Sequence, residues 1–334
     1  MVQKAFNHLL WRIFSGAMAV IIVTGAMTVS PAMAGEPAEQ QNFASPQQAV
    51  AALITAVQNN NEAELLAILG PDSEDLISSG DRVADQKGRA RFLKAYGDKH
   101  FLEQEGDAKA VLHVGLKDYP LPIPLVRKEN EWFFDTQAGM EEILDRRIGR
   151  NELHTIEVLH AYTDAQREYA CMKRNDGAGP EFAQKLMSSE GKRDGLYWEA
   201  KEGEEESPFG PLIAMATQEG YAAGLDEENP EPFHGYYFKI LKAQGEHADG
   251  GAFDYVVGGK MILGFGLVAY PANYDASGIM TFIVNQEGVI YQKDLGEDTP
   301  NAANMTVFDP DDTWKKSEEA PEEEGQDNDK AGIK

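Results

Sequence analysis

The sequence predicts an α+β protein in which an N-terminal part with helices and a curved, cone-like antiparallel sheet leads into a long central helix and a C-terminal antiparallel sheet. Two observations lead to this class. Apolar residues recur with helical spacing in some stretches and alternate with period two in others, and the two patterns occupy separate parts of the chain. About 280 residues lie between a leader-like start and an acidic end, a length typical of about two domains.

The first 34 residues have the pattern of a secretory signal peptide. Lys4 and Arg12 accompany an apolar run at 13–29, and the small residues of 31–34 form an A-x-A cleavage site. An uncleaved membrane anchor is the alternative interpretation, but the cleavage site favours removal near Ala34. We therefore expect a periplasmic or secreted protein with no stable membrane insertion after cleavage.

The chain is strongly acidic. Its formal net charge is −26, and removal of residues 1–34 would take away two basic residues and no acidic one, which gives −28. Because such a surface repels nucleic acid and anionic lipid, we expect no nucleic-acid partner and instead another cell-envelope protein. The single cysteine, Cys171, excludes an internal disulfide, so packed cores must stabilise the fold. We expect Cys171 to be a buried small apolar group, with pairing between molecules left open.

Residues 35–44 are predicted to be a linker, and 45–149 an N-terminal α+β domain. The start of its first helix is marked by Ser45 as N-cap, Pro46 at the first helical position and Gln48, which completes a capping box.

Two more helices and a hairpin sheet are predicted to complete this domain. One helix covers 62–69, and another ends at Gly97. Strands are predicted at 110–114, 121–126 and 131–135. This order of helices and antiparallel strands resembles the cone-shaped fold of nuclear-transport-factor-2-like domains.

Residues 140–173 are predicted to form one long helix. Val158, Tyr162, Ala165 and Tyr169 lie at i, i+4, i+7 and i+11, which makes one face apolar. Gly149 is the weakest position for a helix, and the domain boundary is placed there. We expect sheets of both domains to pack on this helix.

A C-terminal domain is predicted at 150–315, followed by a disordered acidic tail at 316–334 that has nothing large and apolar to bury. Period-two alternation separated by turn residues predicts an antiparallel meander. The strands are predicted at 235–241, 252–257, 265–270, 279–284 and 289–292.

Three segments carry a family resemblance: NELHTIEVLHAYTDAQREYA at 151–170, GYYFKIL at 235–241 and FGLVAYPANYDASGIMTFIVNQEGVIYQKDLG at 265–296. They resemble an exported bacterial family, domain of unknown function 2950, over nearly the whole chain after the leader. That resemblance implies no activity. The C-terminal half also resembles the soluble part of type IV pilins and pseudopilins, in which a helix precedes an antiparallel sheet. Charged residues at 141–147 occupy the place of the membrane-spanning half of the pilin helix, so the polymerising segment is absent.

One candidate catalytic group lies in the N-terminal domain. His113 sits in an apolar strand with Asp118 and Asp135 close in sequence, and a histidine–carboxylate pair in the mouth of a cone-shaped domain can act as a general base. A histidine satisfied within the core is the alternative interpretation.

Two patterns invite a metal interpretation that their spacing does not support. His154, Glu157 and His160 form H-x-x-E-x-x-H, but the outer two lie about 120° apart around a helix, so they do not converge on one ion. The aspartates at 309–312 lack the glycine and the distal glutamate of a calcium loop. We expect no metal and no cofactor.

Tyr236 and Tyr237 point to opposite faces of one predicted strand, so one of them can be exposed and mark a binding surface. The expected function is therefore non-enzymatic binding or assembly in the cell envelope. The alternative is a small-molecule-binding protein or an enzyme that uses a pocket in the N-terminal domain. A deep pocket lined by His113 and carboxylates would favour the alternative, and a flat exposed aromatic face would favour the first interpretation.

Overall fold

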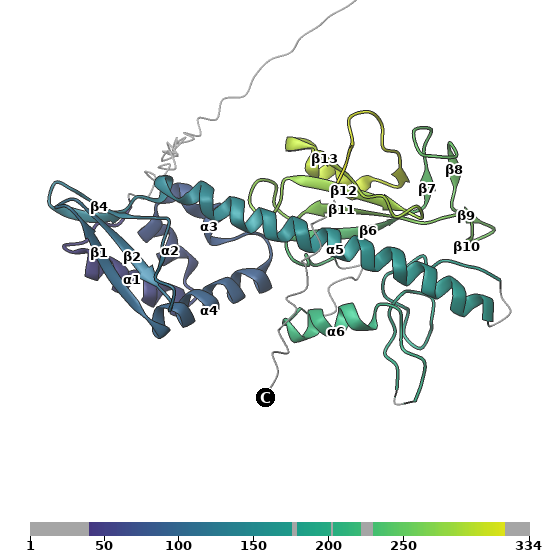
Figure 1. The fold of residues 1–334 in the computed structure, drawn as a ribbon, viewed down its shortest axis with the longest axis horizontal. Helices are drawn as coiled ribbons and strands as arrows, with labels where there is room; N and C mark the ends of the chain where they lie inside the picture. Colours follow the sequence, from purple (N-terminus) through teal and green to yellow (C-terminus); the bar gives the residue numbers. More distant parts are fainter. Residues whose placement is uncertain (1–39, 176–178, 202, 222–229, 318–334) are drawn as a thin grey trace, which may run out of the picture. The chain divides into compact units, whose positions relative to one another are not determined.

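The computed structural model describes residues 40–175, 179–201, 203–221 and 230–317, and these form an α+β fold, as predicted (Figure 1). The predicted signal peptide and the acidic tail from residue 318 onward lie outside the described residues. None of the helices in the described part combines the length and apolar composition needed to cross a bilayer. The division into domains at 149 and 150 stays a prediction.

The N-terminal helices begin where their capping residues predict. Helix α1 (Pro46–Gln58) starts after Ser45, whose hydroxyl accepts a hydrogen bond from the Gln48 N–H. Asn61 caps the next helix in the same way, and Asp81 caps α4. The remaining helical elements here are α2 (Glu62–Leu69), η1 (Pro71–Ser73), α3 (Glu74–Ile77) and α4 (Arg82–Asp98).

An antiparallel sheet follows, with strand order β1-β2-β4-β5 and β3 beside β2. The predicted strand at 121–126 is regular only from Leu125, because Pro120, Pro122 and Pro124 have no N–H to donate to a ladder. The edge strand β1 was not predicted, since its exposed residues show no alternation. The strands are β1 (His100–Glu105), β2 (Lys109–Val114), β3 (Tyr119–Pro120), β4 (Leu125–Lys128) and β5 (Glu131–Phe134).

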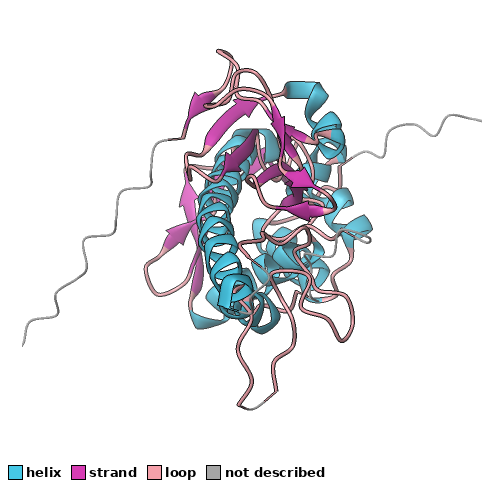
Figure 2. Ribbon diagram, turned by 90° about the vertical axis from the view of Figure 1, so that its right-hand side faces the viewer, coloured by secondary structure: helices cyan, strands magenta, loops and turns pink. Residues whose placement is uncertain are grey.

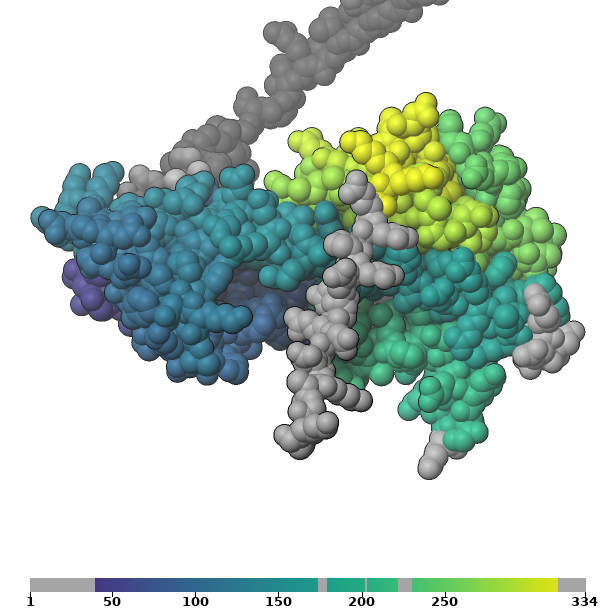
Figure 3. Space-filling model, in the orientation of Figure 1, coloured from purple at the N-terminus to yellow at the C-terminus, as the bar shows by residue number. Residues whose placement is uncertain are grey.

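The short helix η2 (Thr136–Ala138) leads into helix α5 (Met140–Asn175), which runs without a break through Gly149 (Figure 1). Ile143 in its first turns packs on the N-terminal core. The apolar stripe predicted at 158–169 is buried, with Tyr162 fully enclosed, and packs on the C-terminal sheet. In Figure 3 the dark blue atoms of α4 lie below the teal atoms of α5.

The predicted C-terminal meander is confirmed for the strands near 235–241, 265–270, 279–284 and 289–292, whereas the strand predicted at 252–257 is divided into two short strands, β8 and β9, that pair outside the main sheet. Its five-stranded antiparallel sheet has the order β15-β13-β12-β11-β6, and Figure 2 shows these strands beside the long helix. A smaller sheet, β14-β7-β8, contacts β11 and β12 through β14, and β9 and β10 form a two-stranded sheet of their own. The longer strands are β6 (Tyr236–Leu241), β11 (Gly266–Pro271), β12 (Met280–Asn285) and β13 (Tyr291–Asp294). The shorter elements are β7 (Ala243–Gln244), β8 (Phe253–Asp254), β9 (Val256–Val257), β10 (Lys260–Met261), η3 (Gly296–Asn304), β14 (Val307–Phe308) and β15 (Lys315–Lys316).

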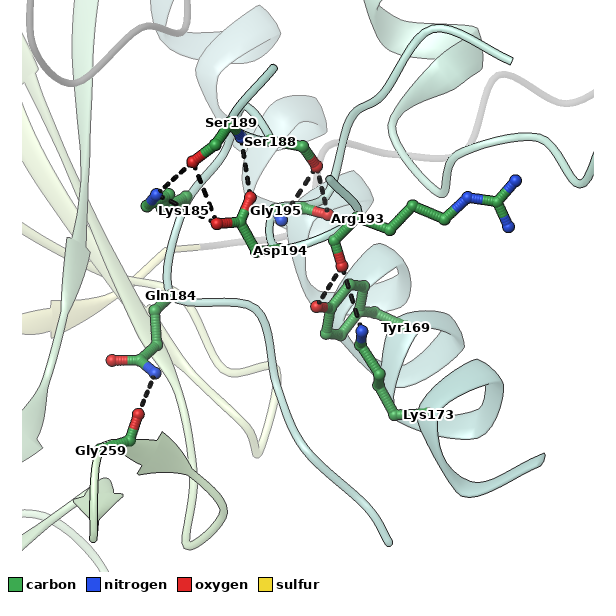
Figure 4. A network of polar contacts seen from close by, with 10 residues as sticks. All are labelled: Tyr169, Lys173, Gln184, Lys185, Ser188, Ser189, Arg193, Asp194, Gly195 and Gly259. Carbon is green, nitrogen blue, oxygen red and sulfur yellow. Dashed lines mark hydrogen bonds and ion pairs between the residues drawn. The ribbon is translucent and has the colours of Figure 1, made fainter. Parts of the chain in front are cut away.

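The segment 179–201 has little regular structure and is fixed by polar contacts against the end of α5 (Figure 4). Tyr169 and Lys173 both donate hydrogen bonds to the Arg193 carbonyl, and the Asp194 carboxylate accepts from the Ser189 N–H and hydroxyl. Gly195 must be a glycine, because a Cβ there would come within 2.6 Å of the neighbouring backbone. Helix α6 (Gly210–Gln218), which was not predicted, follows and buries Ile213 and Ala216 in the same core as α5.

The structure corrects the prediction for Cys171. We predicted a buried thiol, but Cys171 is exposed because it shares the outward stripe of α5 with Asp164 and Arg167, while Tyr169 and Ala170 on either flank of that stripe are buried.

Candidate functional site

The predicted catalytic residues do not form one site. His113 in β2 is held by the Asp118 main-chain carbonyl at 2.9 Å and by the Glu103 carboxylate at 2.8 Å. The Asp118 carboxylate pairs with Lys99 instead, and Asp135 follows β5 beside a separate small cavity. The structure therefore brings His113 and Asp118 together without a histidine–carboxylate contact between them, and it leaves Asp135 apart.

The predicted binding tyrosines are also constrained. Tyr236 is 0% exposed, and its hydroxyl donates to the Met280 carbonyl, so it is not available as a surface contact. Tyr237 lies half-buried on the opposite face, beside Tyr270. The strand carries core residues on one face and a partly covered face on the other, and an exposed aromatic patch is not formed by this pair.

A larger site lies elsewhere, in a cavity of about 540 Å³ between α4 and α5. One wall is apolar and comes from α1, α2, the end of α4, the segment before β4 and the start of α5. Its lining side chains include Leu53, Val57, Leu65, Phe92, Ile123 and Ile143.

The other wall is polar and follows one face of α5. Arg147, Arg150, Asn151 and His154 lie at i, i+3, i+4 and i+7, so a single helical face presents all four to the cavity. This face continues the apolar stripe that packs on the C-terminal sheet. Along one helix, the inward stripe changes from apolar to polar where the cavity begins.

Arg147 fixes one side of this wall. Its guanidinium donates to the carbonyls of Asp75 at 2.6 Å and Leu76 at 2.7 Å, and it reaches Ala276 at 3.4 Å. Burial lowers the pKa of Arg147, and the nearby Asp85 carboxylate opposes that shift. Burial raises the pKa of Asp85, although hydrogen bonds from the Ser79 N–H and hydroxyl stabilise its charged form.

The cavity is cationic although the protein is strongly anionic. Five Lys or Arg side chains line it, against the carboxylates of Asp85 and Glu219. Lys87 pairs with Glu219 at 2.7 Å, and Arg89 pairs with Glu62 at 3.1 Å.

Two of the lining arginines have no such partner. In the described ranges, neither Arg91 nor Arg150 makes an ion pair or a side-chain hydrogen bond. Burial and the adjacent positive charges of Arg91 and Arg146 lower the pKa of Arg150. This part of the wall therefore holds uncompensated positive charge.

A histidine pair closes the polar end. The rings of His154 and His234 lie 4.3 Å apart, and His234 Nε2 is 3.4 Å from the Glu219 carboxylate. Burial, with the neighbouring His154, lowers the pKa of His234 to about 4, so this imidazole is neutral near pH 7. His154 Nδ1 is buried and has no hydrogen-bond partner among the described residues. It can accept from or donate to a bound molecule, according to its tautomer.

Asp81 holds the segments around this end together. Its carboxylate accepts from the Ala84 N–H at the start of α4, from the Tyr221 hydroxyl and from the Gly235 N–H, each at 2.9 Å. Asp81 is 1% exposed, so these three hydrogen bonds satisfy a buried charge.

Part of the cavity volume exists because residue 88 is a glycine and has no side chain. Gly88 lies within α4 and lines the cavity, and the atom nearest to an added Cβ would be Arg91 Nη2 at 3.9 Å. A glycine inside a helix costs about 1 kcal/mol relative to alanine. A side chain at this position would project into space that the structure leaves open.

The residues of the two metal-like sequence patterns lie in different places in the structure. Among the described residues, no group of three or more His, Cys, Asp or Glu side chains is placed to hold a metal ion. His154 lines the cavity, whereas Glu157 and His160 are exposed on other faces of α5. Asp309 contacts His247 at the surface, 3.0 Å away.

Sequence reasoning missed most of this site, including Arg91, Arg150, Glu219, Tyr221 and His234. Within its own segment of the sequence, each of these residues has the pattern of a solvated charge or of a core aromatic side chain. One signal was present: the apolar stripe of α5 continues at the same spacing into Asn151 and Arg147.

No curated protein and no solved structure matches the chain. One family model does match, over residues 40–317, and its description is "Protein of unknown function (DUF2950)". That range includes every residue of the cavity wall described above. The chain therefore belongs to the DUF2950 family.

Proposed function

We propose that this protein is an exported, non-enzymatic binding protein that takes a small molecule into the cavity between α4 and α5. The observation that carries the proposal is the cavity itself, about 540 Å³ with one apolar wall and one polar wall. This size and this combination of walls are typical of ligand sites. The proposal joins the binding role expected from the sequence with the pocket of its alternative, although the pocket is lined by residues other than His113.

Several features favour binding over catalysis. Glu219, the carboxylate nearest the histidine pair, is engaged by Lys87, and this hydrogen bond and His234 keep its pKa below the usual range against the effect of burial. The Ser79 hydroxyl donates a hydrogen bond to Asp85, and among the described residues Ser79 makes no hydrogen bond to a histidine. A nucleophile activated by a neighbouring base is therefore not assembled in the described part of the wall.

Export is part of the proposal. It is supported by the basic start, the apolar run at 13–29 and the A-x-A site of the sequence. We expect a mature N-terminus at Gly35 on protein from a periplasmic or secreted fraction. N-terminal sequencing measures this directly, and an intact Met1 on cytoplasmic protein would contradict it.

We also propose that the C-terminal half is a pilin-like scaffold that serves a cell-envelope partner. The order of a long helix and an antiparallel meander supports this, while the charged residues at 141–147 argue against polymerisation through that helix. In this arrangement the C-terminal half anchors α5, and α5 in turn positions the polar wall of the cavity.

A pair of glycine variants tests cavity binding. Gly88→Leu places a side chain in the cavity, whereas Gly97→Leu makes the same change in the same helix at an exposed position with no atom within 4 Å of the added Cβ. The probe is N-phenyl-1-naphthylamine, a neutral apolar dye whose fluorescence rises on binding.

We expect saturable dye binding by the wild-type protein and by Gly97→Leu, and a loss of at least tenfold in affinity for Gly88→Leu. Both variants should remain folded, because leucine is the better helix former. Equal binding by all three proteins, or no saturable binding by the wild type, would refute the proposed function.

A further inference from the structure

The lining of the cavity changes from apolar to polar along α5. Ile143 lies at its apolar end and His154 at its polar end, eleven helical steps apart, which corresponds to about 16 Å. Arg150 lies one turn from His154 on the same face. A molecule that fills the cavity along this helix therefore meets hydrocarbon at one end and positive charge toward the other.

The positive charge there is unmatched in the described structure. Arg91 comes from α4 and Arg150 from α5, so the two helices bring exposed guanidinium groups of like charge to the same cavity. Two like charges that line one cavity repel each other, and an anion between them would remove that repulsion. Guanidinium groups also match carboxylate and phosphate oxygens in geometry, since they present paired N–H donors.

We propose that the ligand of this cavity is an amphiphilic organic acid, with its carboxylate or phosphate head between Arg91 and Arg150 and its apolar chain toward Ile143. This assignment rests on the proposed function, because it names the chemical class of the molecule bound in the same cavity. A neutral apolar ligand would leave both arginines unpaired. An acidic peptide or a free inorganic anion would leave the apolar wall unfilled.

A head-group series with one fixed chain tests the assignment. The ligands are dodecanoate, dodecyl phosphate, dodecanol and dodecyltrimethylammonium, each below its micelle concentration and titrated against bound N-phenyl-1-naphthylamine at pH 8. The proteins are the wild type, Arg91→Gln, Arg150→Gln and the double variant. Arg82→Gln is the matched control, because Arg82 is an exposed cation of α4 that does not line the cavity.

The two acids should bind the wild type at least tenfold more tightly than dodecanol, and the cationic amphiphile should bind most weakly. The double variant should lose roughly 10- to 100-fold in affinity for both acids, in line with the loss of charge-assisted hydrogen bonds, with little change for dodecanol. Arg82→Gln should behave as the wild type. The relative affinities of dodecanoate and dodecyl phosphate then decide between the two head groups.

The failures are distinguishable. If dodecanoate, dodecyl phosphate and dodecanol bind equally, or if the acids are insensitive to the double variant, this assignment is overturned while the cavity still binds apolar molecules. If no ligand binds and the dye does not bind either, the proposed function fails and this assignment falls with it. Misfolding is monitored separately by urea unfolding without ligand: Arg150→Gln removes like-charge repulsion, so its urea midpoint should equal or exceed that of the wild type.

Discussion

Replacement of Asp81 by asparagine should destabilise the protein by about 3–6 kcal/mol. Asp81 is almost fully buried, and its carboxylate accepts three hydrogen bonds from three separate segments: the start of α4, the segment that follows α6 and the turn before β6. No other residue type can accept all three with the same side-chain length and charge. This side chain therefore concentrates much of the polar contact around one end of the cavity.

The magnitude follows from the two carboxylate oxygens. Oδ1 accepts from the Ala84 N–H, and an asparagine oxygen can keep that helix cap. Oδ2 accepts from the Tyr221 hydroxyl and the Gly235 N–H, and an amide nitrogen there would face two donors with another donor. Two hydrogen bonds to a charged group, at about 1.5–3 kcal/mol each, are lost and the donors stay buried.

Urea unfolding followed by tryptophan fluorescence measures this change. Asp72→Asn is the matched control, because Asp72 is exposed in η1, and it should stay within about 0.5 kcal/mol of the wild type. Tyr221→Phe removes one of the two Oδ2 donors and should cost about 2 kcal/mol. In the double variant the costs should be clearly less than additive, since both changes remove one shared contact. An Asp81→Asn protein within 1 kcal/mol of the wild type would show that this junction does not hold the segments together.

Three further outcomes are expected. Tyr162→Ala should cost about 3 kcal/mol or more in urea unfolding, because it empties the core and removes the hydrogen bond to the Gly266 carbonyl, and a silent change would refute this packing. Cys171 should react with a thiol reagent in the folded protein, and Cys171→Ser should change stability by less than about 0.5 kcal/mol. The unfolded chain binds a proton at His234 near pH 6.5 and the folded chain only near pH 4, so stability should fall as pH drops through that window, by up to about 2 kcal/mol after allowance for solvent screening. His234→Asn, which suits the positive φ of this position, should flatten that slope relative to the wild type, whereas an unchanged slope would assign it to other groups such as Glu219.

The elements that the sequence predicted are those fixed by local chemistry. The start of α1 follows from Ser45 and Pro46 alone, and the buried strands β6, β11 and β12 follow from alternation and turn residues. Strand β1 escaped prediction because an exposed edge needs no apolar pattern, and the start of the strand predicted at 121–126 was wrong because prolines interrupt its hydrogen bonds. Apolar periodicity indicates which residues are buried. It gives no signal for an exposed strand that is stabilised only by its backbone hydrogen bonds to the neighbouring strand.

The cavity could not be predicted in the same way, because its polar wall is assembled from α4, α5 and the segments that carry Glu219 and His234. Each contributes one or two charged or aromatic side chains, which in isolation have the pattern of a solvated helix face. Only their arrangement in the folded chain shows that Arg91 and Arg150 line the same cavity and that the rings of His154 and His234 are in contact. That arrangement depends on tertiary contacts such as those of Asp81, which join residues more than 100 positions apart.

Helix α5 takes part both in the core, which the sequence pattern predicts, and in the cavity, which only the tertiary structure shows. In its C-terminal half the inward stripe is apolar and fills the core, and in its N-terminal half the same stripe carries Arg147, Asn151 and His154. A polar stripe on the inward side of a helix costs stability unless hydrogen bonds, water or a ligand satisfy it. Gly88 on the facing helix adds to that cost, because it weakens α4 and leaves space unfilled. Filling the space with leucine should therefore raise the free energy of unfolding in the same protein that loses ligand binding, and this opposition of stability and binding is what separates a ligand cavity from a packing defect.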